Sequence, residues 1–145
     1  YLSTNAADYE SFLKINKPKY DDSWERWNRT LDMLKHLDTR TVLRITLIRN
    51  YNDQKEMIPA FAEMFRKASP HFIEIKSYMH IGRSTNRLEH ENMLEMSEVK
   101  KFSEQIAIES KIFSIMDESL VSRISILQNN ERFIDRYIPT YSNTN

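Results

Sequence analysis

The chain has 145 residues, the length of one domain, and its composition excludes several classes of protein. Lys and Arg together number 21, as do Asp and Glu, so no overall field draws the chain to nucleic acid or a membrane, and any basic patch must be local. No segment reaches the roughly 20 apolar residues of a membrane span, and none has the pattern of a signal peptide. The lack of cysteine excludes disulfides, thiolate metal ligands and a cysteine nucleophile, and fits a cytoplasmic location.

The hydrophobic spacing predicts alternating strands and helices. The chain opens on a strand-like run, Tyr1-Leu2-Ser3-Thr4, so we expect the sequence to begin inside a fold, as part of a longer polypeptide. Pro59 fits the first turns of a helix, where a missing N–H is tolerated. The predicted helices cover 8–15, 22–37, 54–68 and a segment capped by Ser97, and the predicted strands cover 1–4, 41–49, 72–81, 112–116 and 122–127.

The two central strands carry charge on one of their faces. Their apolar faces hold alternate residues: Leu43, Ile45 and Leu47, then Ile73, Ile75, Ser77, Met79 and Ile81. Their opposite faces hold Val42, Arg44, Thr46 and Ile48, then Phe72, Glu74, Lys76, Tyr78 and His80. Parallel strands are normally apolar on both faces. The polar face must therefore point into an interior that accepts charge, and the C-terminal mouth of a barrel is such a place.

The order of elements predicts an α/β fold. A complete barrel of eight strands needs about 200–250 residues, so this chain suffices for a little over half of one. We expect a partial barrel of about four parallel strands, with terminal short strands, over residues 1–128. Residues 129–145 are expected to form a C-terminal extension that is partly disordered, at 142–145 in particular.

Charged and polar residues on the two central strands, 41–49 and 72–81, are candidates for ligand binding. Arg44 and Lys76 compete for one carboxylate, Glu74, which leaves one cation over for a carboxylate ligand. Tyr78 and His80 come at the end of the strand, within reach of a ligand. His80 has no Asp or Cys partner at metal-ligand spacing, so no metal site is predicted.

A local basic loop follows this strand. Arg83, Asn86 and Arg87 offer donors that suit phosphate and sugar groups, which position RNA without reading its sequence. A solvated loop is the alternative reading of the same residues.

Several short segments carry a resemblance to a known family, and they lie at 1–6, 16–18, 22–26, 40–52, 70–84, 86–88, 92–93, 117–119 and 122–123. On these motifs, residues 1–128 resemble the C-terminal half of the radical S-adenosylmethionine enzymes that make 4-demethylwyosine in tRNA, in their archaeal form. The block 72–87 is the specific part of the match, since the helices alone would prove nothing.

The resemblance implies a TIM-like barrel enzyme whose [4Fe-4S] cluster is bound by three cysteines upstream, outside this chain. In that family the cluster reduces S-adenosylmethionine to a 5′-deoxyadenosyl radical, which takes a hydrogen from 1-methylguanosine next to the anticodon of phenylalanine tRNA. Pyruvate then donates two carbons, which makes the enzyme a lyase. The implied partners are tRNA, pyruvate and the rest of the barrel, in the same longer chain or a second chain, and no membrane. The chain alone is expected to be inactive.

The resemblance also implies roles for residues. Cofactor binding is expected of Ser3, Asn5, Arg44 and Thr46, substrate binding of Lys76, Tyr78 and His80, and tRNA binding of Arg83, Asn86 and Arg87, while the catalytic residues are not assigned. The loops depart from the family pattern at Asn5-Ala6-Ala7, at Arg49-Asn50-Tyr51-Asn52 and around 94–97. A non-catalytic RNA-binding or scaffold module derived from the enzyme is therefore the alternative.

Overall fold

The structure, a computed structural model, describes residues 1–137, and the predicted disorder at 142–145 lies outside them. Its helices are α1 (Tyr9–Asn16), α2 (Ser23–Leu34), α3 (Ile58–Ala68) and α4 (Met96–Ser110), and its strands are β1 (Leu2–Ser3), β2 (Val42–Leu47), β3 (Phe72–Ser77), β4 (Phe113–Ser119) and β5 (Ile124–Asn129). Within the described residues, no helix is both long enough and apolar enough to cross a membrane. The division into 1–128 and 129–145 stays a prediction.

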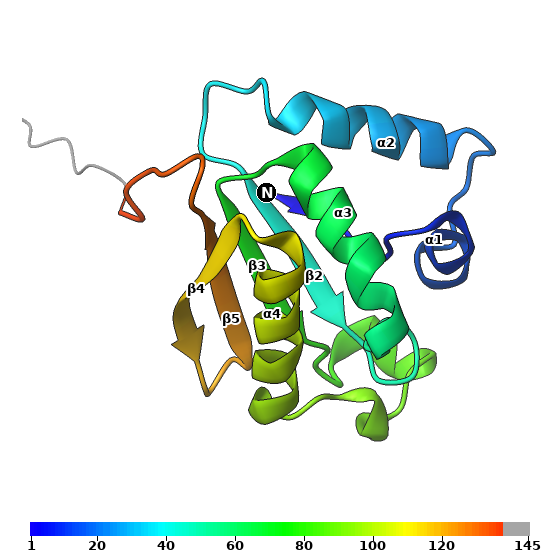
Figure 1. Cartoon of the computed structure of the whole chain (residues 1–145). Coiled ribbons are helices and arrows are strands. Elements are labelled where there is room, and N and C mark those ends of the chain that lie inside the picture. The colour runs from blue at the N-terminus through cyan, green and yellow to red at the C-terminus, as the bar shows by residue number, and fades with distance from the viewer. Residues whose placement is uncertain (138–145) are drawn as a thin grey trace, which may run out of the picture.

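The strands form one open sheet in the order β1-β2-β3-β5-β4 (Figure 1). Strands β1, β2 and β3 pair in parallel, β5 runs antiparallel to β3, and β4 runs antiparallel to β5. The α/β class is confirmed, but the sheet is mixed and not closed, so the predicted half-barrel of about four parallel strands is not seen. Only residues 120–123 join β4 to β5, and a parallel pair would need a crossover of about a dozen residues.

One face of the sheet is covered by α3 and α4 (Figure 1). The alternate residues predicted to be apolar are fully buried there: Leu43, Ile45, Leu47, Ile73 and Ile75. They belong to one core cluster with side chains of the two helices: Phe61, Phe65, Val99, Phe102 and Ile106. Burial of such side chains contributes about 1.5–3 kcal/mol each, so this face anchors the sheet.

Two predicted boundaries were wrong in ways that matter for the site. Strand β3 ends at Ser77 rather than at 81, because β2 ends at Leu47 and only the Tyr78 N–H still bonds to it, at 2.7 Å from the Leu47 carbonyl oxygen. Helix α4 is capped by Glu95 rather than by Ser97. The Glu98 carboxylate accepts the Glu95 N–H at 2.7 Å, which satisfies a free donor of the first turn.

Left-handed backbone occurs at several residues that are not glycine: Lys17, Asn50, Ser69, Lys111 and Arg123. The single glycine, Gly82, also has a positive φ of 63°, at the start of a 3₁₀ turn over Gly82–Asn86. Lys17, Ser69 and Lys111 end α1, α3 and α4, where glycine is the usual residue because it has no Cβ.

Candidate functional site

The face of the sheet opposite α3 and α4 carries a charged pair at its centre. Ser3, Arg44 and Glu74 lie opposite one another in the parallel register, so their side chains share this face. The Arg44 guanidinium donates two hydrogen bonds to the Glu74 carboxylate, of 2.8 Å from Nε and 3.2 Å from Nη2. The side chain of Glu74 is only 8% exposed, and a carboxylate so buried requires such a partner.

Lys76 is the cation left over. It lies opposite Thr46 on β2 and Ile124 on β5, one step further toward the C-terminal end of β3. Among the described residues no carboxylate lies within ion-pair distance of Lys76. The competition that the sequence left open is thus resolved in favour of Arg44, and Lys76 has no carboxylate partner among residues 1–137.

Asn5 and Asn52 tie the C-terminal ends of β1 and β2 together. The Asn5 side-chain oxygen accepts the Thr46 N–H at 3.0 Å. Asn52 is completely buried and its amide nitrogen donates to the carbonyl oxygens of Asn5 and Thr46, each at 2.9 Å. Its own oxygen accepts the Ile48 N–H at 2.7 Å. The Asn5 side-chain oxygen therefore takes part in a hydrogen bond of the fold, and only its NH₂ group remains for a ligand.

Tyr78 and His80 lie just beyond β3 and contact each other. The Tyr78 hydroxyl is 3.1 Å from His80 Nδ1, and the ring of His80 meets that of His90 edge-on at 6.0 Å between centroids. Tyr78 is 4% exposed and so is largely a packing residue. His80 is partly exposed and can still reach a ligand.

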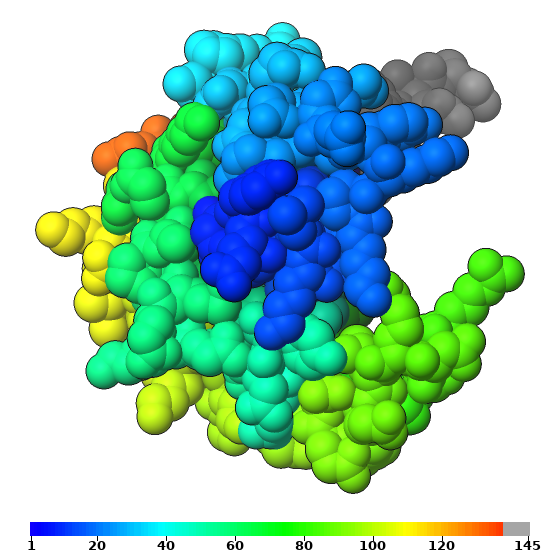
Figure 2. Space-filling model, turned by 90° about the vertical axis from the view of Figure 1, so that its right-hand side faces the viewer, coloured from blue at the N-terminus to red at the C-terminus, as the bar shows by residue number. Residues whose placement is uncertain are grey.

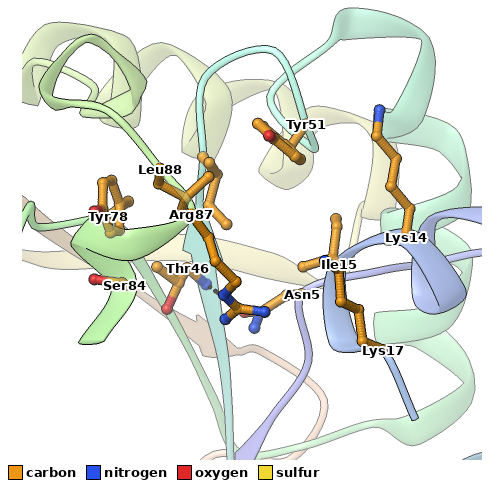
Figure 3. Close-up of a pocket in the computed structure, with 11 residues that line it drawn as sticks. Asn5, Lys14, Ile15, Lys17, Thr46, Tyr51, Tyr78, Ser84, Arg87 and Leu88 are labelled. Carbon is orange, nitrogen blue, oxygen red and sulfur yellow. Dashed lines mark hydrogen bonds between the residues drawn. The ribbon is translucent and has the colours of Figure 1, made fainter.

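A pocket of about 230 Å³ opens where β1, β2 and β3 end (Figure 3). It brings together four of the predicted site residues: Asn5, Thr46, Tyr78 and Arg87. The other lining residues are Lys14, Ile15, Lys17, Ile48, Tyr51, Ser84 and Leu88. Figure 2 shows the same hollow at the surface, between the blue α1 segment and the green segment that follows β3. Arg83, Asn86 and Arg87 are exposed beside it.

The segment between β3 and α4 is fixed by an arginine that the sequence reading missed. Arg49 donates two hydrogen bonds to Glu98, at 2.6 and 2.7 Å, and others to the carbonyl oxygens of Glu91 and Met93. The hydrogen bond with Arg49 lowers the pKa of Glu98, and the same bond raises the pKa of Arg49. The basic loop is therefore held in place at the C-terminal edge of the sheet.

Two further lysines of the pocket, Lys14 and Lys17, were also missed. They stand three residues apart, Lys14 within the first predicted helix and Lys17 just beyond its end, and in a helix this spacing places two side chains on one side. That spacing was the available signal, but a lone lysine pair at the end of a helix is usually solvated.

Comparisons with known proteins place the chain in a family. Residues 67–129 match the family model for wyosine base formation. A tRNA 4-demethylwyosine synthase of Methanocaldococcus jannaschii, which depends on S-adenosyl-L-methionine, is 42% identical over 137 residues, or 93% of this chain and 42% of the relative. A protein of the same name from Oryza sativa subsp. japonica is 40% identical over 111 residues, which are 76% of this chain and 17% of that protein.

Solved structures agree with these relatives. The structure of TYW1 with a lysine-pyruvate adduct superposes with a TM-score of 0.82 and 40% identity, and the match covers 92% of this chain and 41% of that one. A crystal structure of archaeal TYW1 gives a TM-score of 0.72 at 34% identity. The sequence matches and the shared fold thus define the class, the wyosine base formation family. The chain belongs to the tRNA 4-demethylwyosine synthase family, matches the C-terminal part of its members, and spans about 42% of the Methanocaldococcus relative.

Proposed function

We propose that this chain forms the C-terminal wall of an enzyme that converts 1-methylguanosine next to the anticodon of phenylalanine tRNA to 4-demethylwyosine, with pyruvate as the second substrate. The sequence resemblance is what specifies these substrates. The structural observation that supports the proposal is that four predicted site residues lie together at one edge of the sheet. Asn5, Thr46, Tyr78 and Arg87 line one pocket there. Catalytic sites of barrel enzymes lie at that edge of their strands.

The open face of the sheet supports a larger assembly. A hollow of about 460 Å³ on this face is lined by Tyr1, Val42, Phe72, Glu74 and Ile126, among other residues. The buried Arg44–Glu74 pair lies on the same face. Both features suit an interior, and we propose that the rest of the barrel covers them, in the same longer chain or in a second chain.

The residues of this chain offer binding groups to S-adenosylmethionine but no ligand to an iron–sulfur cluster. The chain contains no cysteine, so it offers no thiolate to an iron–sulfur cluster. For S-adenosylmethionine it offers the exposed hydroxyl of Ser3, the amide of Asn5 and the hydroxyl of Thr46. The Arg44 guanidinium is largely engaged by Glu74, so Lys76 is the better group for a carboxylate.

The proposed roles are separated in space. Lys76 lies within the sheet and would bind the carboxylate of the cofactor or of pyruvate. Arg83, Asn86 and Arg87 lie on the exposed loop and would contact the sugar–phosphate backbone of tRNA. Variants of the two groups should therefore lose different functions.

The test uses a chimera in which residues 1–137 replace the matching part of the Methanocaldococcus relative. Changing both Arg83→Ala and Arg87→Ala should weaken tRNA binding and reduce its salt dependence by about one to two phosphate contacts. The yield of 5′-deoxyadenosine without tRNA should survive. Lys76→Met should leave tRNA affinity nearly intact and reduce that yield or the use of pyruvate.

Lys101→Met, on the exposed side of α4, is the control and should change neither quantity. Filter binding at two salt concentrations and chromatography of 5′-deoxyadenosine give the two readouts. An equal loss of tRNA binding in both variants would show that β3 merely supports the loop.

A further inference from the structure

The pocket at the C-terminal edge is lined by cations from two separate segments. Lys14 and Lys17 come from the end of α1, and Arg87 comes from the far side of the hollow (Figure 3). Its lining contains no Asp or Glu. Within residues 1–137 none of the three cations lies within ion-pair distance of a carboxylate, whereas Arg44, Arg49 and Arg66 each have such a partner.

Neighbouring groups hold the Lys14 side chain and the Lys17 backbone in place. The Lys14 ammonium lies 5.1 Å from the centre of the Tyr51 ring, a cation–π contact that holds the side chain at the rim of the pocket. Tyr51 is held in turn, because its N–H donates to the Ile48 carbonyl oxygen at 3.0 Å. Lys17 ends α1 with a φ of 47°, and its N–H donates to the Leu13 carbonyl oxygen at 3.2 Å.

The left-handed backbone at Lys17 is unfavourable for a residue with a Cβ. Glycine is the usual residue at this position of a helix, and it would remove that strain. Lys111 also ends its helix, α4, with a positive φ, of 66°, at the opposite edge of the sheet (Figure 1). The chain therefore contains two lysines at left-handed helix ends, only one of which lines the pocket.

We propose that Lys14, Lys17 and Arg87 bind phosphate groups of the RNA backbone at this pocket. The inference rests on the proposed function and adds α1 to its RNA surface. Three cations without a carboxylate among them suit a phosphodiester, since Arg and Lys donate charge-assisted hydrogen bonds to its oxygens. All three side chains are exposed at the rim, so a macromolecule can reach them. The partly exposed hydroxyl of Thr46 and the amide of Asn5 lie on the floor, toward which Arg87 points (Figure 3).

The experiment measures binding of an anticodon stem–loop of phenylalanine tRNA by the full 145-residue chain. Lys14→Gln and Lys17→Gly should each lower the slope of log affinity against log salt by about one. A stem–loop of scrambled sequence should show the same reduction, since phosphate contacts carry no sequence information. Each variant should weaken binding several-fold at low salt.

Thermal unfolding separates binding from folding. Lys17→Gly and the control Lys111→Gly should both keep or raise the melting temperature, because both remove a left-handed lysine. Only Lys17→Gly should lose RNA affinity. A merely structural role for Lys17 predicts unchanged binding in both variants.

The outcomes distinguish this inference from the proposed function. Failure of the parent chain to bind either stem–loop would overturn the phosphate pocket, whereas loss of tRNA binding by the unmutated chimera would overturn the proposed function. RNA binding that falls in the Arg83→Ala, Arg87→Ala double variant and is unchanged in the lysine variants would overturn the phosphate pocket alone. Competition of S-adenosylmethionine or pyruvate with the stem–loop, lost in Lys17→Gly, would assign the pocket to a small carboxylate instead.

Discussion

The two edges of the sheet use polar residues in different ways. At the N-terminal edge of β3, the buried Asn129 donates to Ser69 and Pro70, and its oxygen accepts the N–H groups of Glu131 and Arg132. At the C-terminal edge, cations such as Lys76 and Arg87 have no ion-pair partner among residues 1–137. The polar groups around Asn129 bind one another and stabilise the fold, whereas the second edge combines a bonded amide, Asn52, with cations that have no ion-pair partner among residues 1–137.

In parallel α/β proteins, one end of the strands generally supports stability and the other end carries function. The two edges of this sheet differ in the same direction. Changes at the N-terminal edge should therefore alter the free energy of unfolding and leave RNA affinity unchanged. Changes of the cations Lys76 and Arg87 at the C-terminal edge should do the reverse.

The largest effect is expected at Asn129. Asn129→Leu removes its four hydrogen bonds and leaves the buried Pro70 carbonyl oxygen without this donor, at a cost of about 3 kcal/mol in the free energy of unfolding. Urea unfolding measures this loss. Asn130→Leu, at an exposed neighbour, should cost less than about 1 kcal/mol. Equal losses at the two positions would contradict the special role of the N-terminal edge.

A smaller effect is expected in the centre of the open face. Glu74→Gln leaves Arg44 without its counter-charge, and we expect a loss of about 1–2 kcal/mol, limited because the Arg44 side chain is 39% exposed. Glu63→Gln breaks the surface pair with Arg66 and should change stability by less than about 0.5 kcal/mol. Chemical unfolding of both variants makes the comparison, and a larger loss in Glu63→Gln would refute it.

His71 should make stability depend on pH. Its Nδ1 accepts the Thr41 N–H at 3.1 Å, which requires the neutral ring. Burial, followed by the charges of Arg132 and Arg40, lowers the pKa of His71 below its usual value of 6.5. The unfolded chain therefore binds more protons below pH 6.5, so stability is complete above that pH and falls as the pH drops toward the folded pKa. Unfolding curves of the parent and His71→Gln across this window should converge at the acidic end, and parallel curves would contradict the assignment.

The smallest effect is expected at Asn50, where φ is 67°. Asn tolerates left-handed backbone better than most residues, so Asn50→Gly should raise stability by only about 0.5 kcal/mol. Asn50→Ala should lower it by about 1 kcal/mol for the opposite reason. Melting temperatures of both variants test the sign, and a stabilising alanine would contradict the conformation.

The sequence predicted most elements because their hydrophobic periods are clear. The alternation in β2 and β3 identified both faces, and it named Arg44 as one of two partners for Glu74. It could not show that β4 and β5 form an antiparallel hairpin, since short apolar runs carry no direction. It also missed Lys14 and Lys17, because their closeness to Arg87 depends on how α1 packs beside the loop after β3.

Cross-linking of tRNA to the chain, followed by mass spectrometry of the linked peptides, locates the RNA surface. We expect links to peptides that contain Lys14, Lys17, Arg83 and Arg87, all at the C-terminal edge, and their loss at high salt. Links confined to peptides around Lys111 and Arg132, at the opposite edge, would contradict this location.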